Sequence, residues 1–304
     1  MASPMESSLP KPMHRWHNRE GMTLAGDSWG DPNGPLVVLM HGGGQTRHAW
    51  KGAGRALGEA GYHAVAYDAR GHGDSDWAPD GDYSMNALMA DLQLMVDELD
   101  DDHPILVGAS LGGVVGLAAV GEGKIDGSAL VLVDVAPRVE PEGASRVLEF
   151  MTAYPDGFAS LDEVADAIAV YHPHRNRPRN LEGLSKNVRL GDDARYRWHW
   201  DPQTITGFDT DLVQIQIRLE AATQGLRIPT LLVRGGMSDV MSDQGVEEFR
   251  RLYPQAEYVN VENASHMVAG DRNDLFSDAV LDFLARHVVV GVGADRTGIP
   301  GEDQ

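Results

Sequence analysis

One stretch, residues 104–120 (PILVGASLGGVVGLAAV), constrains the fold of this 304-residue chain more than any other. An apolar run ends there at G-A-S-L-G and a run of small apolar residues follows, which predicts a strand, a sharp turn and a helix. A serine at the apex of such a turn has strained backbone geometry, and glycines on both sides avoid collisions with the strand and the helix. Ser110 is therefore a candidate nucleophile, beside the unpaired N–H groups that begin the following helix.

G-x-S-x-G by itself is a weak pattern, because ordinary strand-to-helix turns also contain serine. The rest of the chain supplies the context. Apolar runs typical of buried parallel strands occur at 36–40 and 129–133, and further strands are predicted at 63–67, 229–234 and 256–261. Amphipathic stretches typical of helices alternate with them at 50–60, 84–99, 211–222, 243–252 and 274–287. The alternation predicts an α/β fold with a doubly wound, mostly parallel sheet.

The strand pattern disappears between Pro137 and Asp211, where amphipathic pieces alternate with polar loops. We therefore expect a helical cap inserted after the sixth main strand. Residues 22–29 predict an edge strand. The expected division is a loose N-terminal tail (1–20), a core in two parts (21–136 and 212–288), the cap (137–211) and a C-terminal tail (289–304).

Composition excludes several classes of function. Lys and Arg number 25 against 46 Asp and Glu, and the formal charge of −21 would repel nucleic acid and an anionic membrane. The absence of cysteine excludes disulfides, thiolate metal sites and a cysteine nucleophile. His172 and His174 lack the further ligands that a metal site requires, so we expect no metal. No signal peptide or membrane-spanning stretch is evident, which favours a cytoplasmic protein.

Three side chains follow predicted strands: Ser110, Asp239 and His266. Because the C-terminal ends of parallel strands share one edge of a sheet, all three are expected at the same edge. A serine hydroxyl requires an imidazole to take its proton, and the imidazole requires a carboxylate to hold its tautomer. The order Ser, Asp, His along the chain is that of G-x-S-x-G hydrolases. The sequence therefore predicts a catalytic triad.

With these residues in place, the chain resembles the α/β-hydrolase superfamily over about residues 22–287. The resemblance rests on HGGGQTRHAW (from residue 41), YDARGHGDSD (67), VGASLGGVVG (107), LLVRGGMSDV (231) and ENASHMVAGD (262). It is greatest for bacterial cofactor-free, haloperoxidase-type esterases. It implies hydrolysis of carboxylic esters without a cofactor, with the backbone N–H groups of Gly43 and Leu111 as oxyanion donors. HGGG is also typical of the hormone-sensitive-lipase-like branch, but the elbow here reads GASLGG instead of GDSAGG.

Asp134 is a rival for the acid, because some members of the superfamily carry it one strand earlier. Its loop leads directly into the expected cap, so a hinge or a helix-capping carboxylate is the alternative interpretation. We favour Asp239, since its Gly-Gly-x-Ser-Asp loop matches the family position of the acid.

The expected function is hydrolysis of small-molecule carboxylic esters through an acyl-enzyme. The same triad is compatible with lactone hydrolysis, peroxyacid formation or hydrolysis of carbon–carbon bonds. A receptor that retains the triad and binds a ligand is the alternative from a different class.

Overall fold

Five short, largely apolar strands and one more polar edge strand form the parallel part of the central sheet. In this computed structural model, which describes residues 11–138, 140–208, 211–271 and 273–288, they are β3 (Leu36–Met40), β4 (His63–Tyr67), β5 (Ile105–Ala109), β6 (Ala129–Val133), β9 (Thr230–Gly235) and β10 (Glu257–Val261). The antiparallel strands β1 (His14–His17) and β2 (Thr23–Trp29) complete the sheet. Its order is β1-β2-β4-β3-β5-β6-β9-β10. From β3 the chain continues to β4 on one side of the sheet and then crosses to β5 on the other side of β3. Ligand sites in open α/β sheets form at such a switch point, here between β3 and β5.

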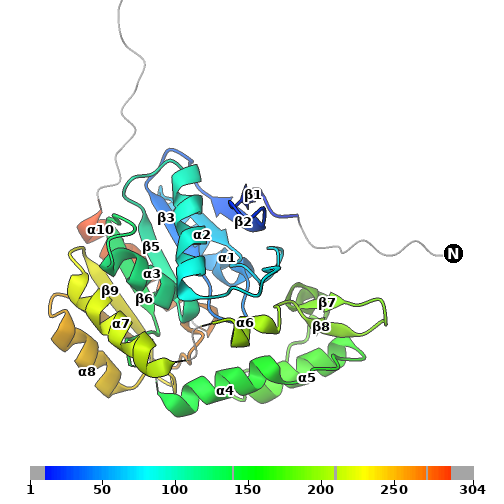
Figure 1. Cartoon of the computed structure of the whole chain (residues 1–304). Helices are drawn as coiled ribbons and strands as arrows, with labels where there is room; N and C mark the ends of the chain where they lie inside the picture. Colours follow the sequence, from blue (N-terminus) through cyan, green and yellow to red (C-terminus); the bar gives the residue numbers. More distant parts are fainter. Residues whose placement is uncertain (1–10, 139, 209–210, 272, 289–304) are drawn as a thin grey trace, which may run out of the picture.

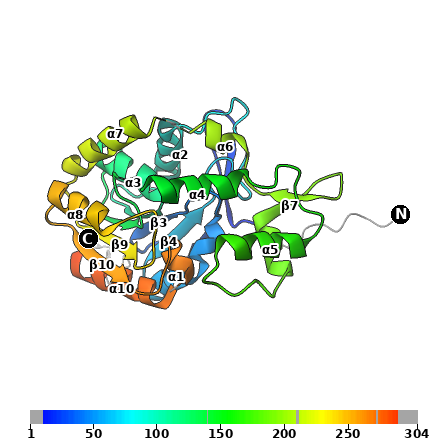
Figure 2. The same ribbon diagram turned by 90° about the horizontal axis from the view of Figure 1, so that it is seen from below.

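Helices cover both faces of the sheet (Figures 1 and 2). One face carries α1 (Lys51–Glu59) and α10 (Asn273–His287), together with the short η1 (Arg47–Trp50) and α9 (Val268–Asp271). The other carries α2 (Met85–Glu98), α3 (Leu111–Gly121), α7 (Leu212–Gly225) and α8 (Asp243–Leu252). Along β3, Val38 and Met40 pack under the second group of helices, and Val37 and Leu39 pack under the first. Burial on both faces explains why the strands read as continuous apolar runs.

Residues 137–211 lie between β6 and α7, and we call them the inserted segment. Within its described residues it contains α4 (Pro141–Thr152), α5 (Leu161–Tyr171), η2 (Glu182–Asn187), β7 (Val188–Leu190), β8 (Tyr196–Trp198) and α6 (Gln203–Thr206). α4 runs beneath the sheet in Figure 1 and passes in front of it in Figure 2, whereas α5 lies below β7 and β8 in Figure 1. Beside the expected helices, the segment contains an antiparallel hairpin of β7 and β8 that the sequence pattern did not indicate. Strands of three residues are too short to give a recognisable alternation.

The N-terminal part differs from expectation. Residues 14–17 form β1 and therefore are not part of a loose tail, and β2 is an inner strand instead of an edge strand. Trp16 is buried against Gly26, where a Cβ atom would lie 2.5 Å from the indole ring. Glycine on β2 thus makes room for the indole that holds β1 to the sheet. The expected tails at 1–10 and 289–304 lie outside the described residues.

Several helices begin at a side chain that accepts a backbone N–H, as their sequences suggest. Ser84 caps α2, Asp211 caps α7 and Ser242 caps α8. Such caps satisfy N–H groups that have no partner inside the helix. They explain why the predicted helix starts agree with the structure to within a residue or two.

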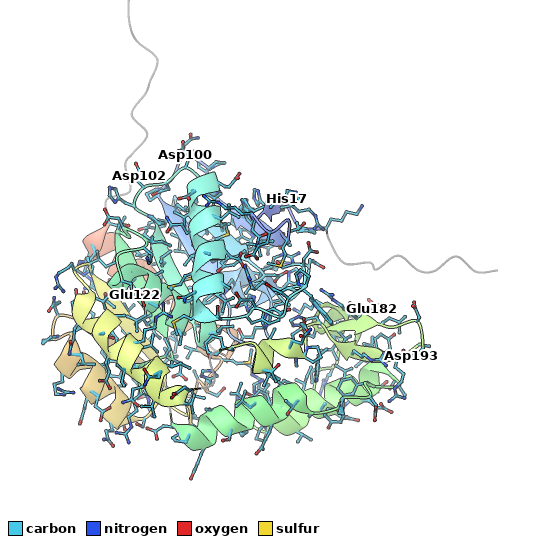
Figure 3. All side chains as sticks on the ribbon, in the orientation of Figure 1. His17, Asp100, Asp102, Glu122, Glu182 and Asp193 are labelled. Atoms are coloured by element: carbon cyan, nitrogen blue, oxygen red, sulfur yellow. The ribbon has the colours of Figure 1, made fainter. Side chains whose placement is uncertain are left out.

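The exterior is acidic. Figure 3 labels Asp100 and Asp102 in the loop between α2 and β5, together with Glu122, Glu182 and Asp193; all five are exposed and point away from the core. Among the described residues, no helix combines the length and the apolar character required to cross a bilayer.

Candidate active site

Ser110 occupies the turn between β5 and α3. Its backbone has φ 48° and ψ −115°, a left-handed conformation that side-chain-bearing residues rarely adopt. A Cβ on Gly108 would lie 2.5 Å from the Gly112 carbonyl group, and one on Gly112 would lie 2.5 Å from the Met40 carbonyl oxygen. Both glycines are therefore required for the close approach of strand, turn and helix. The geometry is that of a nucleophile elbow.

The imidazole of His266 contacts a buried carboxylate. Its Nδ1 lies 2.7 Å from Oδ2 of Asp134, and because a carboxylate accepts, Nδ1 carries the proton and donates it. Asp134 is fully buried and also accepts from the Gly235 N–H at 3.0 Å and from the Ser238 hydroxyl. Three donors compensate the burial of this charge. Nε2 of His266 is left as the nitrogen that can accept a proton.

Asp239, the residue that we expected beside His266, lies elsewhere. Its Oδ2 is 2.5 Å from Nη2 of Arg146 on α4, and its side chain is about a third exposed (34%). The order of the strands explains why Asp134, and not Asp239, lies beside His266. β6 lies between β5 and β9, so the first residue after β6, Asp134, comes between the elbow and the loop of His266. Asp239 follows the end of β9 by four residues, and by then the chain has turned toward α4, where a Cβ on Gly143 would lie 2.3 Å from the Asp239 carbonyl oxygen.

Ser110 and His266 line the same small cavity. Its volume is about 20 Å³, and its other walls come from the region of η1 and α9 and from the ends of β5 and β6: Gln45, Ala49, Trp50, Ala109, Val133 and residues 267–270. A space of this size accommodates about one water-sized group. A larger hollow of about 570 Å³ lies between the ends of α1 and α10, but none of its lining residues is a candidate site residue.

The turn after β3 places glycine N–H groups beside the elbow. A Cβ on Gly42 would lie 3.2 Å from Cβ of Ser110. The Gly42 N–H donates to Oε1 of Gln45 at 3.4 Å, and the Gly44 N–H donates to Nε2 of His72 at 3.2 Å. The Gly43 N–H has no acceptor among the described residues. It is therefore the one of the three that is open to a ligand atom.

Leu111 supplies a second open N–H group as the first residue of α3. Gly43 and Leu111 thus follow β3 and β5, the adjacent strands between which the sheet order reverses. The direction of the Gly43 N–H is set by its peptide plane, because the Gly42 carbonyl of that plane accepts from Nδ1 of His41 at 2.8 Å and from the Gln45 N–H at 3.1 Å.

Three buried histidines surround this turn, and their hydrogen bonds define their tautomers. Nε2 of His41 accepts from the Ala69 N–H at 3.0 Å. Desolvation by burial lowers the pKa of His41 to about 4 and that of His72 to about 3, and it lowers the pKa of His199 well below its ordinary value. All three are therefore neutral at physiological pH. Neither His72 nor His199 stands out in the sequence; the only signal is the G-H-G sequence in the loop after β4.

The inserted segment reaches the same turn. Sδ of Met151 on α4 lies 3.6 Å from the position of a Cβ on Gly43, and the ring of Trp200 lies 3.5 Å from that on Gly44. Trp200 is stacked on Trp198 at 4.9 Å between ring centroids and belongs to the separate core of the inserted segment. Among the described residues, no three His, Cys, Asp or Glu side chains gather in a way that would hold a metal ion.

Comparison with known proteins agrees with this architecture. The family described as alpha/beta hydrolase fold matches residues 35–272. The esterase Rv0045c of Mycobacterium tuberculosis is 32% identical over 256 residues, which cover 80% of this chain and 80% of that protein. A 3-hydroxybutyrate-oligomer hydrolase of Cupriavidus necator is 27% identical over 80% of this chain and 86% of its own length. A non-heme chloroperoxidase, CPO-A1 of Kitasatospora aureofaciens, is 29% identical over 88% of this chain and 97% of its own length.

Solved structures show the same fold. The crystal structure of the Mycobacterium tuberculosis esterase superposes with a TM-score of 0.72 at 28% identity, covering 91% of this chain and 93% of that chain. E-2-(acetamidomethylene)succinate hydrolase superposes with a TM-score of 0.79 at 23% identity, covering 90% of this chain and 98% of that chain. The sequence match, the doubly wound sheet and the elbow lead to one conclusion: this chain belongs to the α/β-hydrolase family.

Proposed function

We propose that this protein is a serine hydrolase that cleaves carboxylic esters of small molecules through an acyl-enzyme. The observation that carries the proposal is the 2.7 Å contact between Nδ1 of His266 and buried Asp134, next to a serine in elbow geometry. The relatives named as an esterase and as an oligomer hydrolase support the reaction class.

In the first half of the proposed reaction, Oγ of Ser110 attacks the ester carbonyl carbon while its proton passes to Nε2 of His266. Asp134 holds the imidazole in the required tautomer and stabilises its charged form. The negative charge that develops on the carbonyl oxygen is stabilised by the N–H groups of Gly43 and Leu111. Collapse of the tetrahedral intermediate breaks the bond to the alcohol, which leaves with the proton from His266.

The second half uses the same groups with water as the nucleophile. His266 takes a proton from a water molecule while the water oxygen attacks the acyl carbon. His266 then returns that proton to Oγ of Ser110 as the carboxylic acid leaves. No step requires a metal or an organic cofactor. Lactones react by the same steps, with the alcohol remaining attached to the acid.

The inserted segment acts as a cap in this proposal. Met151 and Trp200 cover the Gly43–Gly44 turn and present an apolar surface to the bound substrate. A cover of this kind excludes water from the reacting atoms. The acidic exterior disfavours anionic macromolecules as substrates, which agrees with small neutral esters.

Turnover of p-nitrophenyl acetate and butyrate tests the proposal, with a fluorophosphonate as the active-site label. Multiple turnovers and a single adduct on Ser110 are expected. Ser110→Ala should lower kcat by about 10⁴-fold or more and abolish labelling, whereas Ser145→Ala on the exposed face of α4 should change neither. A wild-type protein that binds the esters without turning them over would instead support a receptor.

A further inference from the structure

We propose that His199 of the inserted segment is a positioning residue for the oxyanion hole: together with His72 it holds the Gly44 peptide groups and thereby fixes the turn that presents the Gly43 N–H. The inference rests on the proposed function, because it concerns the N–H that would stabilise the oxyanion. It assigns the inserted segment a part in the reaction beyond covering the substrate.

The turn itself requires an external restraint. Residues 42–45 form a turn closed by the Gln45 N–H on the Gly42 carbonyl at 3.1 Å, and Gly44 in its third position has φ +71°. Two consecutive glycines allow the peptide between them to rotate at little cost. Rotation of either peptide bonded to Gly44 would displace the Gln45 N–H from the Gly42 carbonyl, which shares its peptide plane with the Gly43 N–H.

His72 and His199 hold Gly44 from both sides. The Gly44 N–H donates to Nε2 of His72 at 3.2 Å, and the Gly44 carbonyl oxygen lies 3.3 Å from Nε2 of His199. Nδ1 of His199 accepts from the Gly73 N–H at 2.8 Å, so the proton of this neutral ring is on Nε2 and is donated to Gly44. His72 has the opposite tautomer, since its Nδ1 donates to the Arg70 carbonyl at 3.1 Å. The two rings therefore supply one acceptor and one donor to the two sides of Gly44.

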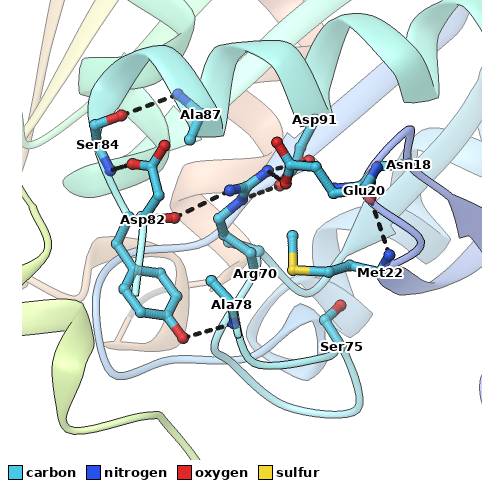
Figure 4. A network of polar contacts seen from close by, with 12 residues as sticks. Asn18, Glu20, Met22, Arg70, Ser75, Ala78, Asp82, Ser84, Ala87 and Asp91 are labelled. Atoms are coloured by element: carbon cyan, nitrogen blue, oxygen red, sulfur yellow. Dashed lines mark hydrogen bonds and ion pairs between the residues drawn. The ribbon is translucent and has the colours of Figure 1, made fainter. Parts of the chain in front are cut away.

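The loop that carries His72 is itself anchored. Figure 4 shows the Arg70 side chain between α2, the loop and the β1–β2 turn. Its Nε and Nη2 lie 2.6 and 2.7 Å from the carboxylate of Asp91 on α2, and its Nη1 donates to the Asp82 carbonyl at 3.0 Å. Arg70 and Asp91 are both buried. A bidentate ion pair of this kind fixes orientation as well as distance.

The inserted segment is attached to the same loop close to His199. The Asp201 N–H donates to the Gly71 carbonyl at 2.8 Å, and the Tyr83 hydroxyl lies 2.5 Å from Oδ2 of Asp201. A guanidinium nitrogen of Arg189 contacts the Gly73 carbonyl oxygen. These contacts hold His199 in place, although it lies 155 positions after Gly44 in the sequence. The way the inserted segment is seated therefore determines how the glycine turn is held.

Two substitutions at His199 separate its two hydrogen bonds. His199→Asn places an amide oxygen near the position of Nδ1, which keeps an acceptor for Gly73 and removes the donor to Gly44. His199→Gln places an amide nitrogen near the position of Nε2, which keeps the donor to Gly44 and removes the acceptor. We expect kcat to fall about tenfold to a hundredfold in the Asn variant, with KM changed less than about twofold, and to fall less than about threefold in the Gln variant.

The affinity for a trifluoromethyl ketone distinguishes a role in the oxyanion hole from a merely structural role, which would leave that affinity unchanged. Oγ of Ser110 adds to its carbonyl carbon and transfers a proton to His266, so that the resulting oxyanion occupies the proposed hole. Its affinity should fall by the same factor as kcat/KM in His199→Asn, while the affinity of the corresponding unreactive alcohol stays constant. Val280→Ala is the control for a general loss of stability, because Val280 is buried on α10 in a core to which neither the glycine turn nor the inserted segment contributes; it should lower Tm and leave kcat unchanged.

Equal losses in the Asn and Gln variants would overturn the inference, as would a loss of kcat in Val280→Ala as large as in His199→Asn. Unchanged ketone affinity in His199→Asn would also overturn it. If His199→Asn does not fold, the other hydrogen bond of Gly44 is tested instead, by comparing kcat of His72→Gln with that of His72→Met. Glutamine retains an acceptor for the Gly44 N–H and methionine does not, so kcat should fall more in His72→Met. Failure of the wild type to hydrolyse esters and to react with the fluorophosphonate would contradict the proposed function, whereas an active wild type with an unchanged Asn variant contradicts only the role of His199.

Discussion

Nδ1 of His266 lies 2.7 Å from Oδ2 of Asp134, the first residue after β6, and this contact places the acid of the candidate triad one strand earlier than the sequence pattern suggests. Asp134 accepts two further hydrogen bonds, from Gly235 and Ser238, which belong to the loop that also carries Asp239. The glycine-rich loop after β9 therefore serves to bind the carboxylate of Asp134. Asp239 forms its ion pair with Arg146 and connects that loop to α4.

The first prediction compares the two carboxylates. Asp134→Asn keeps the shape but removes the charge and can leave His266 in the wrong tautomer, so kcat should fall on the order of 10⁴-fold, the loss known for the trypsin-like triad. Asp239→Asn should change kcat by less than about tenfold, because it weakens only a partly exposed ion pair. Steady-state kinetics with p-nitrophenyl acetate measures both, and the reverse ranking would return the acid to Asp239.

The second prediction concerns stability in acid. Desolvation lowers the pKa values of His41 to about 4 and of His72 to about 3, and lowers that of His199, whereas an unfolded chain restores each to about 6.5. Between about pH 6.5 and pH 4 the unfolded state therefore binds more protons than the folded state. The free energy of unfolding is independent of these groups above pH 7 and falls as the pH falls through that window, by about 2 kcal/mol at pH 5 for each of His41 and His72.

Urea unfolding at pH 7 and pH 5 checks this prediction. His199→Gln removes one of the three imidazoles, so the difference in unfolding free energy between the two pH values should be smaller than in the wild type. An identical difference in the variant would show that His199 is not held neutral by the fold.

The third prediction tests the elbow glycine. Gly112→Ala brings a methyl group within 2.5 Å of the Met40 carbonyl oxygen, which belongs to backbone and cannot move aside. It should destabilise the protein by several kcal/mol, of the size seen for overpacked or strained sites. Gly245→Ala is the control: this helical glycine has no atom closer than 3.7 Å to the added carbon, and alanine should stabilise α8 by roughly 0.5–1 kcal/mol. Thermal and urea denaturation measure both, and equal effects would mean that the crowding at Gly112 is relieved by local movement.

The fourth prediction concerns the buried ion pair of Figure 4. Asp91→Asn leaves the guanidinium of Arg70 buried without its charge partner, which should destabilise the fold by roughly 3–5 kcal/mol. Arg286→Gln breaks an exposed pair with Glu257 and should change the free energy of unfolding far less, because solvent screens such a pair. Urea titrations of the two variants distinguish the cases. A small effect of Asp91→Asn would mean that water or a neighbouring carboxylate compensates Arg70.

Local pattern was sufficient for the parts of this molecule that depend on neighbours in sequence. The buried strands follow from continuous apolar runs, and the starts of α2, α7 and α8 follow from their capping side chains. The elbow follows from two glycines that flank Ser110, because the collisions they avoid involve the adjacent strand and helix. The alternation of strands and helices was sufficient to expect Ser110 and His266 at one edge of the sheet.

The tertiary structure decided which distant groups meet. Asp134 and Asp239 both follow parallel strands, and only the order β5-β6-β9 together with the path of each loop places Asp134 against His266. In the same way, nothing near Gly44 in the sequence indicates that a histidine 155 positions later donates to its carbonyl. Such contacts depend on loop paths and on the position of the inserted segment. A hydrogen bond forms only when its donor and acceptor lie about 3 Å apart, and a pattern of apolar residues does not specify atomic positions that closely.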